Sequence, residues 1–521
     1  MRKGSITVFL SLTMILVLSI LLASLYSVRI AASRAVSAEA ADEAVFSLFS
    51  EYDRDLFERY HLFFLDGGMD TGSPAFPAHI RFLKDSADYI LHPGKGRLPA
   101  SGAAPLALVI ESCELTGYTT AAEQSGRILA AQAVRYMENT LGIQGVQLLL
   151  ENAGRSGGSS GAGGVEGSGS ALLSKDLHGE MEQIRKEAAA AASGTGAGSG
   201  NASSGSGPPA PNSGLPAPAV PEDFENPIET VSEFQKLSLL SLVLPSGAQV
   251  SEKTADSASL PSGRTFEPSL GVVDLPAGIS GSSRLLFNEY VLQHCGCFTS
   301  LNDGALSYGA EYLLSGKPSD KANLTAVVRS LMLLRTGANA AAILGDASLK
   351  AQASQAALMI SAALAIPEFY AAVEALLTAA WAWCESIVDL RALLAGKKVA
   401  PVKDASSWQL SVGSIPSLLS EGDSFAKDHP GGLNYRNYLS ILLLSKKQDL
   451  LQMRLLDMIE STVRSACGRP AFRIDLCVDT LQADFVIRAR NSFRLTARRQ
   501  YSYREEVQRH AFPRMETVNH Q

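Results

Sequence analysis

The hydrophobic and polar positions predict a membrane-spanning helix at the N-terminus of this chain. After Met1-Arg2-Lys3-Gly4, an uncharged and mostly apolar run extends from Ser5 to Val28 and ends at Arg29. About 20 apolar residues, each adding 1.5 Å of helical rise, are enough to cross the hydrocarbon core of a bilayer. We therefore assign residues 1–28 to a short tail and a transmembrane helix.

A signal peptide that is later removed is the alternative interpretation. Such a signal has an apolar core of 7–15 residues that is closely followed by a small-x-small cleavage site. Here the apolar run is longer, and the nearest such site, Ala38-Glu39-Ala40, lies beyond Arg29 and Arg34. The pattern favours a retained anchor in the cell membrane. Basic residues flank both ends almost equally, and we expect the large C-terminal part to be extracytoplasmic.

A helical pattern continues beyond the apolar run, over residues 29–66. Apolar residues recur there at intervals of three and four: Val45, Leu48, Phe49, Tyr52, Leu56 and Tyr60. This stripe predicts an amphipathic stalk, either one long helix or two coaxial helices that end near Tyr60. Arg54 with Glu58 and Asp55 with Arg59 are spaced to form ion pairs on its polar side. Asp66-Gly67-Gly68 then signals a turn.

Five further regions follow along the chain. They are a small α/β region (67–151, with a strand at 106–120 and a helix at 121–151), a Gly/Ser/Pro-rich linker (152–222, with a helix-prone island at 172–192), an irregular connector (223–284), a helical domain (285–466) and a β-rich C-terminal segment (467–521, with strands near 471–480 and 485–503). Gly316, Gly337 and Gly396 stand where helices are expected to end. The predicted fold class is α+β, mainly α, with a long N-terminal transmembrane and stalk helix, small strand elements, a helical bundle and a C-terminal antiparallel β segment.

Composition narrows the classes of partner. The net charge is −7 and no long basic block occurs, so nucleic acid is not an expected partner. A second apolar stretch, 356–383, is interrupted by Pro367, Glu368 and Glu374. We expect it to form a buried helical core and not a second membrane crossing.

Acidic residues of the helical domain are the candidates for catalysis. They are Glu311, Asp320, Glu374, Glu385 and Asp389. Glu385 and Asp389 would share one helix face and could act in acid–base chemistry or hold a metal, but Arg391 lies close enough in sequence to pair with them. We favour structural ion pairs, and no nucleophile elbow, zinc-protease or phosphate-loop motif is present. The sequence therefore predicts no enzyme, catalytic residue, cofactor or small-molecule substrate.

The cysteines offer a weak metal motif and one candidate disulfide. His294-Cys295-Gly296-Cys297 contains three side chains that could bind a metal, but no second ligand pair follows at zinc-site spacing. We favour buried thiols at a helix end and predict no metal site. Cys467 and Cys477 flank a turn, and a disulfide between them is left open.

Arginines are concentrated near the C-terminus. The C-terminal segment contains Arg488, Arg490, Arg494, Arg498, Arg499 and Arg504. They could form an anion-binding or partner-binding face for lipid headgroups, wall polymer or an acidic protein. The alternative, which we favour, is a solvated strand face whose charges protect a sheet edge from pairing with other chains.

Several segments together resemble a family of unknown function from Gram-positive Firmicutes, DUF5702. The matching segments are KGSITVFLSLTMILVLSILLA (3–23), FSEYDRDLFERYHLFFLD (49–66), FNEYVLQH (287–294), EYLLSGKPSDKANL (311–324), LRTGAN (334–339) and WAWCESIVDLRALLAGKKV (381–399). The resemblance covers most of the chain outside the Gly- and Ser-rich linkers. It implies no activity.

The N-terminus is similar to those of pilin-like and TadE/TadG-like proteins of tight-adherence pili and related secretion systems. This resemblance implies a prepilin-peptidase site between Gly4 and Ser5, although Phe9 stands where pilins usually carry Glu. The predicted function is a non-enzymatic, envelope-facing, single-pass subunit of a Tad/Flp-pilus-like or type II secretion-like apparatus. Its partners would be the lipid bilayer and other membrane subunits. Alternatives are a tethered module that binds wall polymer or anionic lipid and, less favoured, an anchored envelope enzyme.

Overall fold

The computed structural model describes residues 3–92, 106–157, 176–194, 226–256, 259–266, 269–270, 278–279, 281–489 and 501–511. Helices dominate and one small antiparallel sheet is present, which confirms the predicted α+β, mainly α class. The chain forms two compact units. The sheet unit comprises Met1–Gly142, Asp256–Tyr290 and Lys447–Gln521, and the helical unit comprises Ile143–Ala255 and Val291–Lys446.

Both ends of the chain contribute elements to the sheet unit. These elements are α1 (Lys3–Phe49), α2 (Arg54–Tyr60), β1 (Leu65–Asp66), α3 (Phe76–Leu91), β2 (Leu108–Thr120), η2 (Pro261–Gly263), α16 (Gln448–Ala466), η5 (Ile474–Leu476), β3 (Cys477–Ala489) and β4 (Tyr501–His510). Helices α4 (Glu123–Gly157) and α9 (Ser282–His294) have residues in both units. The regions expected separately at 29–66, 67–151 and 467–521 thus fold together, because the C-terminal strand β3 pairs with β1 and β2.

Strand β3 lies at the centre of the sheet. It pairs antiparallel with β2 along one edge (Ile110 opposite Ile487), and with β1 and β4 along the other (Val507 opposite Ala483). The predicted strand at 106–120 is confirmed as β2. The strand expected at 471–480 begins only at Cys477, because the short helix η5 occupies the preceding residues.

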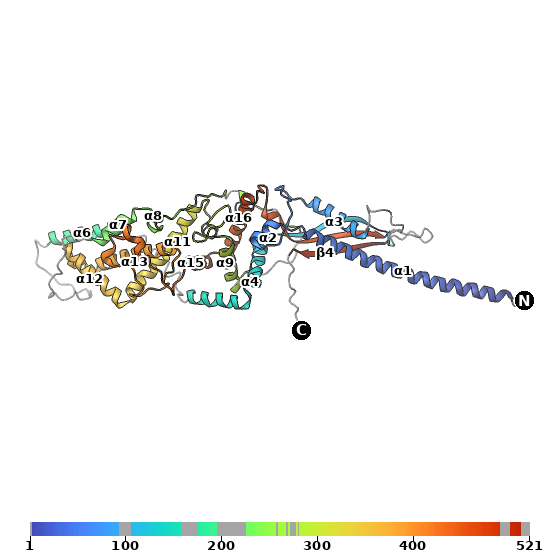
Figure 1. The fold of residues 1–521 in the computed structure, drawn as a ribbon, viewed down its shortest axis with the longest axis horizontal. Coiled ribbons are helices and arrows are strands. Elements are labelled where there is room, and N and C mark those ends of the chain that lie inside the picture. Colours follow the sequence, from blue (N-terminus) through green and yellow to red (C-terminus); the bar gives the residue numbers. More distant parts are fainter. Residues whose placement is uncertain are drawn as a thin grey trace. The chain divides into compact units, whose positions relative to one another are not determined.

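Helices α1 and α3 cover one face of this sheet (Figure 1). The core between them contains Leu83 and Ala87 from α3, and Leu481, Phe485 and Ile487 from β3, all at most 1% exposed. On α1, the buried positions follow helical spacing: Ser33, Ser37, Ala40, Ala41, Ala44, Val45 and Leu48. Most of these side chains are small, which lets the helix axis approach the strands closely.

The apolar stripe of the stalk is divided between two helices. Helix α1 ends at Phe49 and α2 begins at Arg54, where Asp53 caps the helix by accepting the Leu56 N–H at 2.9 Å. Residue Tyr52, between the helices, forms a β-bridge with Leu65. The prediction of helical structure to about Tyr60 is confirmed, with a break at 50–53 that the capping aspartate explains.

Arg469 binds four carboxylates and ties the C-terminal part of the sheet unit to α2 and β1. Its guanidinium lies 2.6 Å from Asp53, 3.0 Å from Asp55, 3.0 Å from Asp66 and 2.6 Å from Asp70. Asp55, expected to pair within its own helix, therefore binds an arginine that is distant in the sequence. Charge-assisted bonds of this kind are roughly twice as strong as neutral ones.

The helical unit is built around α13. Its elements are α6 (Leu177–Gly194), α7 (Pro227–Gln235), α8 (Leu239–Val243), α10 (Gly309–Ser315), α11 (Asp320–Gly345), α12 (Ala347–Ala363), η3 (Pro367–Phe369), α13 (Tyr370–Leu394), η4 (Val412–Ser414), α14 (Leu418–Phe425) and α15 (Tyr435–Ser445). Every residue of α13 from Ala379 to Leu394 is buried, and α11 and α12 pack against it. Helix α16, expected within this helical domain, belongs to the sheet unit instead.

The predicted glycine stops are correct at two of three positions. Gly316 caps α10 with φ of 64°, and Gly396 follows the end of α13 with φ of 79°. Gly337 lies inside α11 and is buried, so the prediction that a helix ends there is wrong. Burial of α11 on both sides of Gly337 outweighs the weak local preference of glycine against helix.

Within the predicted linker, 158–175 and 195–222 lie outside the described residues, whereas the helix-prone island forms α6.

We predict that packing of α1 on the sheet stabilises the sheet unit. Replacing Leu48, which is 2% exposed, by Ala should lower the free energy of unfolding by about 2–5 kcal/mol, because it leaves a cavity. The matched change Phe46→Ala, two residues away at 52% exposure, should cost about 1 kcal/mol or less, because it removes only an exposed contact with Arg509. Urea unfolding of the detergent-solubilised protein measures both. Equal costs would show that this face of α1 does not carry the packing.

Candidate functional site

The N-terminal half of α1 is the first candidate site. Its large apolar side chains between Ile6 and Val28 are exposed, from 44% for Tyr26 to 72% for Met14. Helix Ile6–Phe49 contains a window of mean hydropathy 2.7 of which none is buried, and it is long and apolar enough to cross a membrane. The helix is therefore compatible with the predicted anchor. Its exposed side chains would face lipid or other helices.

Two more helices meet the same length and composition criteria, but their apolar surfaces are used inside the protein. The windows in Asp320–Gly345 and Pro367–Leu394 are 61% and 72% buried. Together they pack as α11 and α13 in the centre of the helical unit. The apolar stretch at 356–383 supplies buried positions to α12 and α13, among them Ala357, Ile360, Leu377 and Trp381, in agreement with the predicted helical core.

The other sequence-predicted sites lie partly outside the described residues. Gly4 and Ser5 are in the first turn of α1, and cleavage between them stays a prediction. Arg488 lies 3.6 Å from Glu111, and Arg504 lies 2.6 Å from Asp484. The remaining arginines of the expected anion-binding face are outside the described residues: Arg490, Arg494, Arg498 and Arg499. Both described arginines therefore have carboxylate partners.

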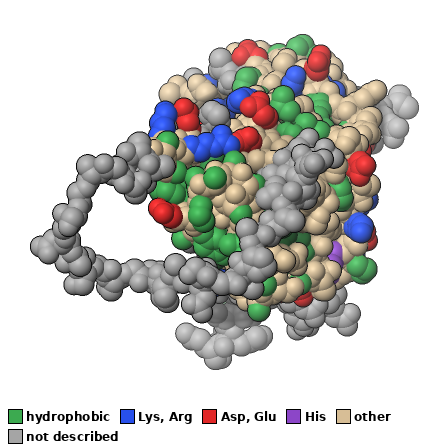
Figure 2. Space-filling model, turned by 90° about the vertical axis from the view of Figure 1, so that its left-hand side faces the viewer, with side chains coloured by type: hydrophobic (Ala, Val, Ile, Leu, Met, Phe, Trp, Pro, Cys, Tyr) green, Lys and Arg blue, Asp and Glu red, His purple; other side chains and the backbone are tan. Residues whose placement is uncertain are grey.

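Charges of both signs are also mixed on the face drawn in Figure 2. Lysine and arginine side chains (blue) lie beside aspartate and glutamate side chains (red), separated by apolar and backbone atoms. Such mixing agrees with the mild net charge of −7.

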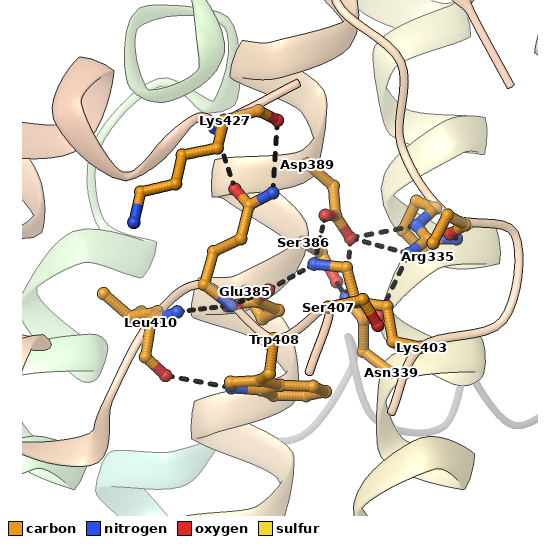
Figure 3. Close-up of polar contacts among 12 residues, drawn as sticks. Arg335, Asn339, Glu385, Ser386, Asp389, Lys403, Ser407, Trp408, Leu410 and Lys427 are labelled. Carbon is orange, nitrogen blue, oxygen red and sulfur yellow. Dashed lines mark hydrogen bonds and ion pairs between the residues drawn. The ribbon is translucent and has the colours of Figure 1, made fainter. Parts of the chain in front are cut away.

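A buried network of four charged side chains is the most organised polar cluster that we describe in the helical unit (Figure 3). Asp389 of α13 binds Arg335 of α11 at 2.9 Å and Lys403, from the segment after α13, at 2.5 Å. Lys403 also binds Glu385, one turn earlier on α13. All four side chains are at most 1% exposed.

Neutral groups complete this network. The Asn339 amide donates to Asp389 at 2.9 Å, and Arg335 donates to the hydroxyl oxygen of Tyr438 and the carbonyl of Ala400, each at 3.0 Å.

The backbone N–H groups of Gln409 and Leu410 donate to Glu385 at 3.0 and 2.9 Å. Two tryptophans, Trp381 and Trp408, donate to the Leu410 carbonyl. The segment around 400–410 is thus held to α11 and α13 by charge and by hydrogen bonds.

The two carboxylates have pKa values shifted in opposite directions. Burial raises the pKa of Glu385, and the positive charge of Lys403 only partly offsets this effect. Burial would also raise the pKa of Asp389, but the charges of Arg335 and Lys403 outweigh it and lower that pKa. Asp389 is therefore the fixed anion of the network. Because the charges face each other and not solvent, this arrangement suits a structural lock.

The predicted partner of these carboxylates is wrong. Arg391 lies 3.6 Å from Asp423 and donates to the Leu242 carbonyl at 2.7 Å. Residues 385, 389 and 391 lie on one helix, but a step of two residues turns a side chain by about 200°, away from the 385/389 face. The expectation of structural ion pairing is right for Glu385 and Asp389, with Lys403 and Arg335 as the partners.

Glu311 of α10 forms a second buried site. It is 0% exposed, and its Oε1 accepts the Phe298 N–H and the Tyr435 hydroxyl, both at 2.8 Å. Its Oε2 has no hydrogen-bond partner among the described residues. Burial raises the pKa of Glu311 to about 7. This carboxyl can therefore change its charge near neutral pH.

The other acidic candidates are held in local structure. Asp320 accepts the Ser251 hydroxyl at 2.6 Å and the backbone N–H groups of Ser307 and Tyr308 at 2.9 and 3.2 Å. Glu374 accepts the Ser354 hydroxyl at 2.5 Å. The structure brings Glu385 and Asp389 together in one network, and Glu374 lies in a separate contact.

The cysteines are free thiols, including Cys467 and Cys477. Burial raises the pKa of Cys295 to about 12, and burial also raises the pKa of Cys297. Between them Gly296 has φ of 70°, which makes the tight turn after α9. Among the described residues, His, Cys, Asp and Glu side chains form no group of three or more that could hold a metal.

Sequence reasoning missed Arg335, Lys403 and Arg469. Arg335 carries a signal, since it is a lone charge in the apolar segment LMLLRTGANAAAIL, and such a charge needs a buried partner. Lys403 and Arg469 lie in irregular segments where no periodicity marks them as buried or paired. Their partners are brought near only by the tertiary fold.

Comparison with known proteins places the chain in a family. The sequence model of a family of unknown function (DUF5702) matches residues 219–489, and the chain belongs to this family. The matched region contains Glu311, the four-charge network and strand β3. Neither the comparison with curated proteins nor that with solved structures gave a match.

We predict that Lys403 neutralises two buried carboxylates that would otherwise be costly. The change Lys403→Met should lower the free energy of unfolding by about 3–5 kcal/mol, because Glu385 loses its buried cation and Asp389 keeps only one of two. The exposed neighbour Lys398, changed to Met, should have an effect within about 0.5 kcal/mol. Denaturant unfolding measures both. A cost below about 1 kcal/mol for Lys403→Met would contradict the lock.

We predict a pH-dependent stability that arises from Glu311. Its folded-state pKa of about 7 exceeds the ordinary 4.5, so the stabilisation that its proton gives is complete below pH 4.5 and is lost as the pH rises through 7. The free energy of unfolding should fall across this window by up to about 1.4 kcal/mol per pH unit, and Glu311→Gln should remove this contribution. Unfolding series at several pH values test it, with exposed Glu368→Gln as the control. An unchanged slope in Glu311→Gln would refute the assignment.

Proposed function

We propose that this protein is a non-enzymatic, single-pass membrane subunit with its folded part on the outer side of the cell membrane. It would act as a structural or assembly component of a Tad/Flp-pilus-like or type II secretion-like apparatus. Its partners would be the bilayer and other membrane subunits, which would pack against the apolar half of α1.

The continuity of α1 carries this proposal. One helix, Lys3–Phe49, contains both the exposed apolar run and the buried face that packs on the sheet. The helix geometry continues from Val28 to Arg29 without a break, so lateral packing of the span would be coupled directly to the folded unit. A simple tether would need only a flexible connection. A rigid connection is useful where the span itself is part of an assembly.

The use of charged residues inside the protein also supports a structural function. The carboxylates that could have served in catalysis bind internal partners: Lys403 and Arg335 for the α13 pair, backbone N–H groups for Asp320, and Phe298 and Tyr435 for Glu311. Carboxylates used in this way hold helices and loops in place. The pilin-like resemblance of residues 3–23 supports the particular type of apparatus.

The experiment that tests the assembly role replaces the apolar side chains of the span by leucine. A chain with Leu at all positions from Ile6 to Leu25 keeps the length and hydropathy of an anchor but changes its lateral surface. We expect this variant to stay in the membrane fraction and to lose co-purification with other membrane subunits. Equal recovery of partners from wild type and variant would show that the helix is only an anchor.

The N-terminus distinguishes an accessory subunit from a processed pilin. Because Phe9 occupies the position where pilins usually carry Glu, we expect the mature chain to retain Gly4. Mass spectrometry of the protein from its native membrane measures this directly. A mature N-terminus at Ser5 would instead identify a substrate of prepilin peptidase.

A further inference from the structure

Helix length places the bilayer boundary near the end of the apolar run of α1. About 20 residues of helix span the 30 Å hydrocarbon core, so a span that begins at Ile6 ends near Leu25. The next residue is Tyr26, followed after two residues by Arg29, the first charge after the apolar run. Tyr26 would therefore lie at the level of the lipid headgroups, where tyrosine and tryptophan are enriched in membrane proteins.

The sheet reaches this same level. The ring of Tyr501, the first residue of β4, packs edge-on against Tyr26 with a centroid distance of 6.0 Å. Two residues further along the strand, the Tyr503 hydroxyl donates to the Ile30 carbonyl at 3.5 Å. Tyr501 pairs with Ala489 of β3, which in turn pairs with Leu108 of β2. These three strand ends form what we call the proximal sheet end.

Strand β4 then runs along α1, away from the apolar run. Its residue Arg509 binds Asp42 at 2.7 and 3.0 Å and stacks over the Phe46 ring at 4.8 Å. From Tyr501 to Arg509 a strand rises about 26 Å, and from Tyr26 to Asp42 a helix rises about 24 Å. The two distances agree, so the strand and the helix run side by side in the same direction, with contacts near both ends of this length.

We infer that the proximal sheet end is a lipid-contact surface, which seats the sheet unit on the headgroup layer of the bilayer. This inference rests on the proposed membrane anchoring. The lipid contact is made by the Tyr26–Tyr501 pair. The apolar edges of the two rings meet acyl chains, while their hydroxyls reach water and headgroups. Because α1 packs on the sheet from Ile30 onward, little helix is left to act as a spacer between bilayer and domain.

Membrane contact at Tyr501 is measured by fluorescence quenching. The full chain, with Tyr501→Trp or with Gln508→Trp, is reconstituted in phosphatidylglycerol–phosphatidylethanolamine vesicles with acyl chains brominated near the headgroup. Gln508 is exposed and lies about 23 Å further along β4, so it is the matched control. Wild type supplies the background from Trp381, Trp383 and Trp408, which all belong to the helical unit.

We expect the indole of Y501W to be quenched at least about twofold more than that of Q508W, since the two differ by about 23 Å in height. Vesicle flotation is recorded for each sample. A protein that fails to float would overturn the anchoring itself. A protein that floats but shows equal quenching at both positions keeps its anchor and overturns the lipid contact. An indole in Y501W that is blue-shifted but not quenched by brominated lipid also overturns it, because another protein would then cover the site.

Discussion

The antiparallel pairing of β3 with strands from the N-terminal third of the chain is the constraint on which the sheet unit depends. β3 joins β1, β2 and β4, and its inward side chains supply much of the surface that α1 covers. Without β3 the small residues of α1 from Ser33 to Ala44 would have no sheet to approach. The rigid link between the apolar run and the folded part follows from this pairing.

The helical unit is organised by electrostatics as well as by burial. The part of α13 from Ala379 to Leu394 is so completely enclosed that its two acidic side chains, Glu385 and Asp389, require partners within the protein. Arg335 supplies one from α11, and Lys403 supplies the other from a segment without regular structure. Removing two charges from water is expensive, and the added hydrogen bonds from Asn339 and the backbone offset part of that cost. Such a network favours one packing of the segment around 400–410 against α11 and α13 over other packings.

Much of the fold could be predicted from residue patterns, because long apolar runs and local alternation are visible in the sequence. The α1 run and the buried α11–α13 region are marked by long apolar runs, and strand β2 is marked by alternating and β-branched residues. Contacts between distant segments could not be predicted. The pairing of Arg469 with Asp53, the choice of Lys403 over Arg391, and the continuation of α11 through Gly337 all depend on tertiary packing.

The distribution of the sheet unit over both ends of the chain has a consequence for biosynthesis. Helix α1 is made well before its packing partners on β3 and β4. At about 5–20 residues per second, this delay is on the order of a minute. During that time the face of α1 that is buried in the folded protein is exposed, open to binding by a chaperone or to mispairing with another nascent chain.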